Sequence, residues 1–169
     1  FNLAINQSIY CSYYVKIIKY FIENIENKSY INNFINNKCS EFKTISNTNN
    51  IKDNKNLNYE EFCEKKKLKI YKKGYSQFLG ELFLNQIIEY SLIIENINIL
   101  FNNLNIIISS TDNEFIEDIL ICIDTLCTTS LRRMQICDKN NIITHLNTID
   151  VSKISMRLKF KILDLKEKL

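Results

Sequence analysis

Hydrophobic residues recur along most of the chain with the three- and four-residue spacing of amphipathic helices. The first such stretch predicts a helix from about Ile9 to Glu26, with one apolar face made of Tyr14, Ile17, Ile18, Phe21 and Ile25. The same spacing predicts further helices at about 30–42, 90–108, 114–130, 139–149 and 153–168. We therefore expect helix after helix, joined by short polar turns.

The segment from Lys43 to Asn58 interrupts this pattern. Its sequence, KTISNTNNIKDNKNLN, has almost no apolar content and cannot bury enough surface to offset the entropy of ordering. We expect a flexible, asparagine-rich loop there. Asn58 followed by Glu61 resembles a capping box, and Thr111 followed by Glu114 resembles a second one. Both pairs predict helix starts.

The two glycines of the chain, Gly74 and Gly80, lie within one apolar register. That register keeps its spacing without a break through Leu68, Tyr71, Tyr75, Leu79, Leu82 and Gln86. A helix that continues through Gly74 is predicted, and the alternative is that Gly74 ends a helix as its C-cap. Gly80 falls opposite this stripe. A glycine inside a helix costs about 1 kcal/mol, so we expect close packing at both positions, with a partner surface as the alternative.

Composition agrees with a helical fold. The chain has 169 residues, 46% of them hydrophobic, with two glycines and no proline. It therefore has few of the glycine and proline turn residues that separate strands in β-rich folds. We predict a single all-α domain over 1–169, arranged as a bundle or an α-solenoid of antiparallel hairpins. No signal peptide or membrane span is expected. The net charge of +3 means that any basic surface is a local patch.

The cysteines and the single histidine do not form a metal or catalytic pattern. The six cysteines include no CxxC pair, so we expect reduced intracellular thiols and no zinc site. Cys122 and Cys127 lie on an apolar helix and are expected in the core. Cys137 and His145 lack an orienting partner, and the chain has no glycine-rich phosphate loop. We expect no enzyme, no catalytic residue and no cofactor.

Two groups of residues are candidates for binding. On the last helix, Ile154, Leu158, Ile162 and Leu165 form an apolar stripe, and another side groups Lys153, Arg157, Phe160 and Asp164. An aromatic ring among charges is typical of an interface anchor. The alternative is that Phe160 packs under a further helix and the charges are only solvated.

The second group is the run KKKLKIYKK, with lysines at Lys65, Lys66, Lys67, Lys69, Lys72 and Lys73 around Tyr71. Lysines neutralise phosphates by counterion release and tyrosine stacks on bases, so RNA contact is one interpretation. A solvated helix face is the other.

Five colinear segments resemble the middle domain of eukaryotic translation initiation factor 4G. GYSQFLGELF is similar to that family's G-x-x-x-F-[IL]-G-E-L-[FY] signature through Gly74, Phe78, Leu79, Gly80, Glu81, Leu82 and Phe83. FNLAINQSIYCSYY, NKCSEF, LICIDTLCTT and ISMRLKFKILD resemble four other segments, in the family's order. Met156 replaces a serine, 131–151 matches poorly, and the family's first helix or so has no counterpart.

The resemblance implies a crescent of HEAT-type helical hairpins that binds and stimulates a DEAD-box RNA helicase, initiation factor 4A, in the cytoplasm. It would act as a scaffold in translation initiation, with mRNA and other initiation factors as further partners. The matched segment ISMRLKFKILD points to a helicase-binding face at Lys153, Arg157, Lys159, Phe160 and Asp164. Related middle domains occur in factors of mRNA decay, cap binding and poly(A)-binding-protein interaction. Membership of one of these groups, or a general RNA-binding helical domain, are the alternatives.

Overall fold

The computed structural model describes residues 1–24, 28–47, 58–108 and 113–169, and over these residues the chain is all-helical without a strand. Its α-helices are α1 (Asn2–Asn6), α2 (Cys11–Asn24), α3 (Lys28–Asn47), α4 (Tyr59–Leu84), α5 (Tyr90–Ile108), α6 (Asn113–Ser130), α7 (Ile136–Thr148) and α8 (Met156–Lys168). Short 3₁₀ turns lie at Ser8–Tyr10, Leu131–Arg133 and Val151–Lys153. The all-α prediction is confirmed.

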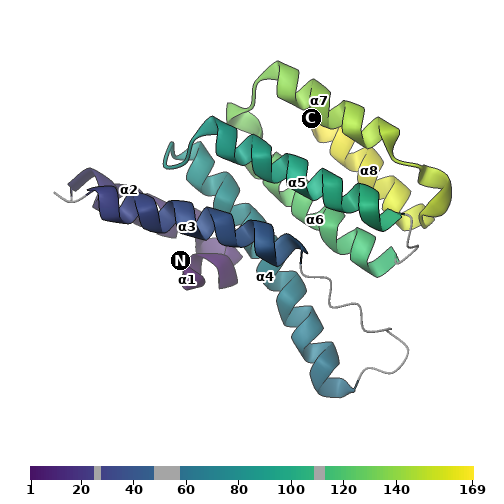
Figure 1. The fold of residues 1–169 in the computed structure, drawn as a ribbon, viewed down its shortest axis with the longest axis horizontal. Helices are drawn as coiled ribbons and strands as arrows, with labels where there is room; N and C mark the ends of the chain where they lie inside the picture. The colour runs from purple at the N-terminus through teal and green to yellow at the C-terminus, as the bar shows by residue number, and fades with distance from the viewer. Residues whose placement is uncertain (25–27, 48–57, 109–112) are drawn as a thin grey trace.

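The helices pack in two sets that alternate along the chain (Figure 1). The first set is α2, α4, α6 and α8, and each of these helices contacts the next one in the set. The second set includes α3 and α5, which pack against each other. The contact between α4 and α6 is the most extensive in the molecule, while α1 packs beside α2 against α4. The N-terminus lies beside α4, and the C-terminus lies beside α7 and α8 (Figure 1). Helix α4 therefore connects the N-terminal helices to the rest of the fold.

Helix α4 runs unbroken through both glycines, and each glycine is a point of close packing. A Cβ atom on Gly74 would lie 1.9 Å from the carbonyl oxygen of Ile5 in α1. A Cβ atom on Gly80 would lie 2.7 Å from Cβ of Thr129 in α6. The packing prediction is confirmed for both, and the C-cap alternative for Gly74 is wrong because the helix continues to Leu84. The signature residues Phe78, Leu79, Leu82 and Phe83 are buried, while Glu81 is partly exposed.

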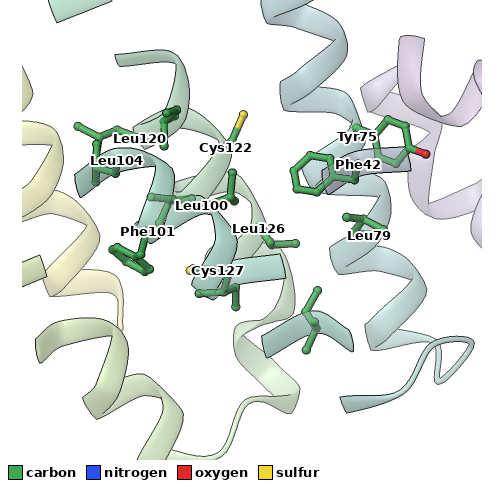
Figure 2. Close-up of a cluster of buried hydrophobic side chains, with 14 of the residues drawn as sticks. Phe42, Tyr75, Leu79, Leu100, Phe101, Leu104, Leu120, Cys122, Leu126 and Cys127 are labelled. Atoms are coloured by element: carbon green, nitrogen blue, oxygen red, sulfur yellow. The ribbon is translucent and has the colours of Figure 1, made fainter. Parts of the chain in front are cut away.

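The core extends on both sides of the α4–α6 contact (Figure 2). Phe42 of α3 packs against Tyr75 of α4 with ring centroids 5.4 Å apart, and the Tyr75 hydroxyl donates to the backbone carbonyl of Lys38 at 2.5 Å. On the other side, Leu100 and Phe101 of α5 meet the buried face of α6 (Figure 2). Burial in helices that are apolar on two sides makes this a continuous core.

Buried thiols contribute to the same core. Cys122 and Cys127 are buried on α6, as predicted, and Cys11 and Cys39 are buried on α2 and α3. Burial raises the pKa of Cys122 to about 11 and the pKa of Cys39 to about 12, because a thiolate in an apolar site loses its hydration. These four groups therefore pack as neutral, small apolar residues.

Helix α5 is long and apolar enough to span a membrane by length and composition, and it is the one described helix that passes this test. Its residues Ile93, Ile97, Leu100 and Leu104 are buried. Burial against α3 and α6 is the arrangement of a core helix in a folded domain. The expected absence of a membrane span stays a prediction.

The predicted apolar face of the first long helix is wrong in part. Ile17 and Phe21 are exposed, whereas the buried residues of α2 are Cys11 and Val15, with Ile18 packed at the edge of the core. The packing partners α1 and α4 contact the face that carries the smaller side chains. A surface rich in tyrosine and phenylalanine is thus left exposed at the N-terminal end.

Helix boundaries follow the pattern closely with three exceptions, one of which is α7, which begins at Ile136 rather than at 139. The predicted loop at 43–58 begins too early, because α3 continues to Asn47 and the Lys43 ammonium pairs with Glu95 of α5 at 2.5 Å. Ile25 and Glu26 of the first predicted helix, residues 48–57 of the predicted loop, and Thr111 of the second predicted capping box lie outside the described residues. The last helix begins at Met156 rather than at 153. The capping box of Asn58 and Glu61 is confirmed, with reciprocal hydrogen bonds of 2.8 and 3.1 Å.

Candidate docking site on the last helix

An exposed apolar ridge runs along the outer side of α8. Met156, Phe160 and Leu163 are 65%, 60% and 51% exposed, and their spacing of i, i+4 and i+7 aligns them on one side of the helix. We call these three residues the docking ridge. The opposite side holds Leu158, Ile162 and Leu165, all buried, which confirms the predicted apolar stripe. Helix α8 is therefore apolar on both its inner and its outer side.

Local structure fixes where α8 begins. Ser155 has the extended backbone of an N-cap residue, and its carbonyl accepts hydrogen bonds from the amides of Leu158 and Lys159. Its own amide donates to Oδ1 of Asn113 at 3.1 Å, at the first residue of α6. This bond ties the start of α8 to the start of α6, so the docking ridge begins at a fixed place on the fold.

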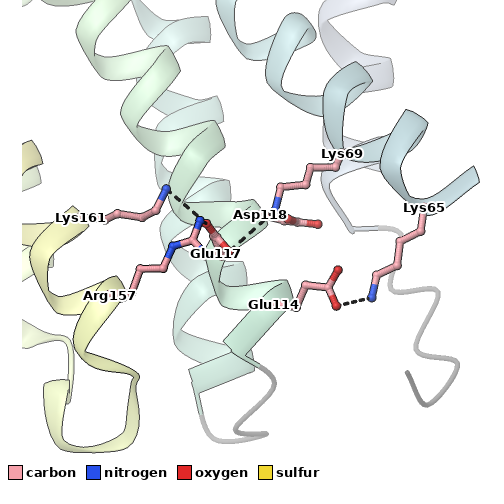
Figure 3. A network of polar contacts seen from close by, with 7 residues as sticks. All are labelled: Lys65, Lys69, Glu114, Glu117, Asp118, Arg157 and Lys161. Atoms are coloured by element: carbon pink, nitrogen blue, oxygen red, sulfur yellow. Dashed lines mark hydrogen bonds and ion pairs between the residues drawn. The ribbon is translucent and has the colours of Figure 1, made fainter. Parts of the chain in front are cut away.

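Charged residues flank the docking ridge on both sides. Toward α6, Arg157 and Lys161 pair with Glu117 at 2.9 and 3.4 Å, and Lys168 pairs with Asp124 at 2.8 Å (Figure 3 shows the Glu117 pairs). The other flank carries Lys159, which is partly exposed. The exposed carboxylates of Asp164 and Glu167 lie on the same side of the helix, so the apolar strip is bordered by charges of both signs and fits a partner groove that is apolar inside and polar at its rim.

The structure places most predicted docking residues around this ridge. Phe160 belongs to it, Arg157 and Asp164 are exposed beside it, and Lys159 lies on its other flank. Lys153 lies in the 3₁₀ turn that precedes the helix. Met156 and Leu163 were missed by the sequence reasoning, although their spacing from Phe160 is a signal that the sequence contains.

The lysine run divides into two groups. Lys65 and Lys69 face α6, where they pair with Glu114 at 2.9 Å and with Asp118 at 2.7 Å (Figure 3). Lys72 is buried, with its ammonium 5.5 Å from the centroid of the Phe115 ring. These three lysines therefore hold α4 against α6.

The other three lysines, Lys66, Lys67 and Lys73, are exposed. The Lys66 ammonium lies 4.4 Å from the centroid of the half-exposed Phe62 ring, one turn earlier on α4. An aromatic ring beside a cation on an exposed helix is the combination with which proteins bind single-stranded nucleic acid, because the ring stacks on a base and the cation pairs with a phosphate. The predicted RNA-binding group is thus reduced to these three lysines together with Phe62, a residue that the sequence reasoning did not include.

Burial sets the electrostatics where α4 meets α6. It raises the pKa of Asp118, and the hydrogen bond from Lys69 offsets part of that rise. Burial lowers the pKa of Lys72, opposed by nearby Asp118. Arg133, in the 3₁₀ turn that follows α6, lies over the Phe83 ring at 4.5 Å and donates to the Phe83 carbonyl. It therefore caps the C-terminal end of α4.

Comparison with known proteins adds no family to this picture. No protein-family model, no curated protein and no solved structure matches the chain. The features that bear on function are therefore the docking ridge, the exposed part of the lysine run and the five segments that resemble the middle domain of initiation factor 4G.

Proposed function

We propose that this chain is a scaffold domain without catalytic activity that binds and stimulates a DEAD-box RNA helicase, initiation factor 4A, through the docking ridge of α8. The observation that carries the proposal is the ridge itself: three large apolar side chains exposed in line at Met156, Phe160 and Leu163. Its position within ISMRLKFKILD, one of the segments that resemble initiation factor 4G, supports the choice of partner.

The alternation of the two helix sets supports a finer description of the fold. Helices α2, α4, α6 and α8 form a continuous series, with α3 and α5 packed beside each other in the second set. In the proposed fold, consecutive helices pair as HEAT-type hairpins that stack into a short α-solenoid.

The test is calorimetric titration of the chain into the helicase, with ATP turnover measured in parallel. Phe160→Ala should weaken binding by about 30-fold, because a central aromatic contact is worth about 2 kcal/mol. The matched control is Ile136→Ala, which removes an exposed apolar side chain from the neighbouring α7. Equal affinity of parent and Phe160→Ala, with both folded, would overturn the proposal.

The measurement of ATP turnover distinguishes a translation-initiation scaffold from the related middle domains of other factors. A scaffold raises helicase turnover and has no ATPase activity of its own. Binding without a rise in turnover would instead favour a middle domain of mRNA decay, of cap binding or of poly(A)-binding-protein interaction. No binding to the helicase would leave RNA as the partner to examine.

A second function, binding of single-stranded RNA by α4, is favoured by the contact between Lys66 and Phe62. We expect fluorescence anisotropy with a fluorescent oligouridine to show affinity that falls as salt rises, because lysines release counterions from phosphates. Lys66→Glu with Lys73→Glu should remove that affinity, while Lys166→Glu on α8 should leave it. Binding that does not change with salt would exclude this role.

A further inference from the structure

One carboxylate on α6 is surrounded by cations from two other helices (Figure 3). The Glu117 side chain, only 14% exposed, pairs with Arg157 at 2.9 Å and with Lys161 at 3.4 Å, both on α8. The Lys69 ammonium of α4 lies 3.9 Å from its other oxygen. Three helices thus meet at Glu117.

The apolar contacts of α8 do not by themselves fix how the helix is rotated. Leu158, Ile162 and Leu165 are buried, but the docking ridge on the other side is apolar as well, so a rotated α8 would still bury apolar side chains. Ion pairs with a partly buried carboxylate do fix rotation, because their strength depends on distance and they are poorly screened. Arg157 and Lys161 lie one turn apart on the same flank, so their pairing with one residue sets that flank against α6.

The arrangement also orders Arg157 for a partner. Its side chain is 75% exposed although its Nη2 is bound to Glu117, so the rest of the guanidinium faces solvent. A guanidinium carries five N–H donors and can bind a second carboxylate while it holds the first. A side chain that is ordered before binding loses less entropy when the partner arrives.

We propose that Glu117 is a positioning residue for the docking ridge. It pairs with Arg157 and Lys161 and thereby sets the rotation of α8 about its axis. In that rotation the docking ridge faces outward, and the Arg157 side chain beside it is ordered before a partner binds. The part that concerns partner binding rests on the function proposed above. The part that concerns the orientation of α8 does not, and it is measured without a partner.

The experiment compares Glu117→Gln with Glu114→Gln. Glu114 lies one turn earlier on α6 and pairs with Lys65 of α4 at 2.9 Å, so Glu114→Gln removes the same charge from α6 at a residue whose ion pair is with α4. Amide hydrogen exchange is measured over α8, at 156–168. We expect exchange there to be several-fold faster in Glu117→Gln and unchanged in Glu114→Gln. Unchanged α8 exchange in Glu117→Gln would overturn the proposal.

A double-mutant cycle distinguishes positioning from general stability. If Arg157 and Lys161 act through Glu117, then Arg157→Gln with Lys161→Gln should accelerate α8 exchange as much as Glu117→Gln does. All three changes together should add little more. Additive effects would mean that these residues stabilise α8 independently, which contradicts the proposal. If Glu117→Gln does not fold, the variant of the two cations supplies the same comparison with Glu114→Gln.

Helicase titration then completes the test. Glu117→Gln should weaken binding about five-fold at low salt, and the difference from the parent should shrink at high salt, where the contact between the exposed Arg157 guanidinium and a carboxylate of the partner is screened. Equal affinities with faster α8 exchange would refute the role in binding but keep the role in orientation. A parent chain that binds no helicase would refute the proposed function, and α8 exchange would still decide whether Glu117 positions the helix.

Discussion

Replacing Gly74 with alanine adds one methyl group at the more closely packed of the two glycines. The new Cβ would lie 1.9 Å from the Ile5 carbonyl oxygen and 3.0 Å from the Ile5 carbonyl carbon. These are backbone atoms, so no change of rotamer can relieve the overlap. Either α1 moves away from α4 or α4 bends.

Two opposing effects decide whether Gly74→Ala raises or lowers the free energy of unfolding. Alanine favours a helix interior over glycine by about 1 kcal/mol, so the substitution would stabilise an isolated α4. Overpacking costs about 1–3 kcal/mol, and displacing α1 instead would expose Ile5, whose burial is worth about 1.5–3 kcal/mol. The steric cost exceeds the gain in helix propensity. Because the overlap is with backbone atoms at 1.9 Å, the steric cost lies in the upper part of its range, at about 2–3 kcal/mol. We expect a net loss of about 1–2 kcal/mol, which for a domain of this size lowers Tm by roughly 2–8 °C.

Urea unfolding monitored by circular dichroism measures this change. Lys73→Ala, at an exposed position beside Gly74, is the control and should change the free energy of unfolding by less than about 0.5 kcal/mol. A double-mutant cycle with Ile5→Ala tests the mechanism: if α1 is displaced, the two substitutions together should cost less than the sum of their separate effects. Gly74→Ala as stable as the parent, or more stable, would refute the reasoning.

Two further predictions concern buried polar groups. The free energy of unfolding should fall as pH rises above about 8.5, because the thiols of Cys11, Cys39 and Cys122 stay protonated in the folded chain and ionise in the unfolded chain, each adding a slope of about 1.4 kcal/mol per pH unit. Urea titrations at pH 7, 8.5 and 9.5 measure this slope, which Cys39→Ala should reduce; a flat profile would contradict it. Tyr75→Phe should cost about 1 kcal/mol by leaving the Lys38 carbonyl without its hydroxyl donor, whereas the exposed Tyr30→Phe should be neutral in the same assay. Equal stability of these two variants would show that the bond contributes nothing.

The helices that sequence predicted best are those with a single strong apolar pattern. The predicted span of 90–108 coincides with α5, and 114–130 differs from α6 by one residue. Both helices are rich in isoleucine and leucine and lie in the core, so burial and pattern agree. The two glycines were also understood correctly, because an unbroken register on both sides of Gly74 leaves no place for a helix end.

The errors have a common physical cause: the spacing of apolar residues shows that a helix has an apolar face, but it does not show which helix packs against that face. Helix α2 carries apolar residues on more than one side, and the face with Cys11 and Val15 is buried because α1 and α4 pack there. The lysines of the run likewise point to several sides of α4. Which of them form ion pairs depends on where Glu114 and Asp118 lie across the α4–α6 contact. Neither neighbour is visible in the local sequence.

The contact between Ile5 and Gly74 also sets an order of events during synthesis. Helix α1 has no stable place until the middle of α4 has left the ribosome, about 70 residues later, which at about 5–20 residues per second is a wait of roughly 4–14 s. During that interval Ala4 and Ile5 lack the α4 surface that buries them in the folded chain. The side of α1 that packs on α4 is therefore accessible to chaperones until the middle of α4 has emerged.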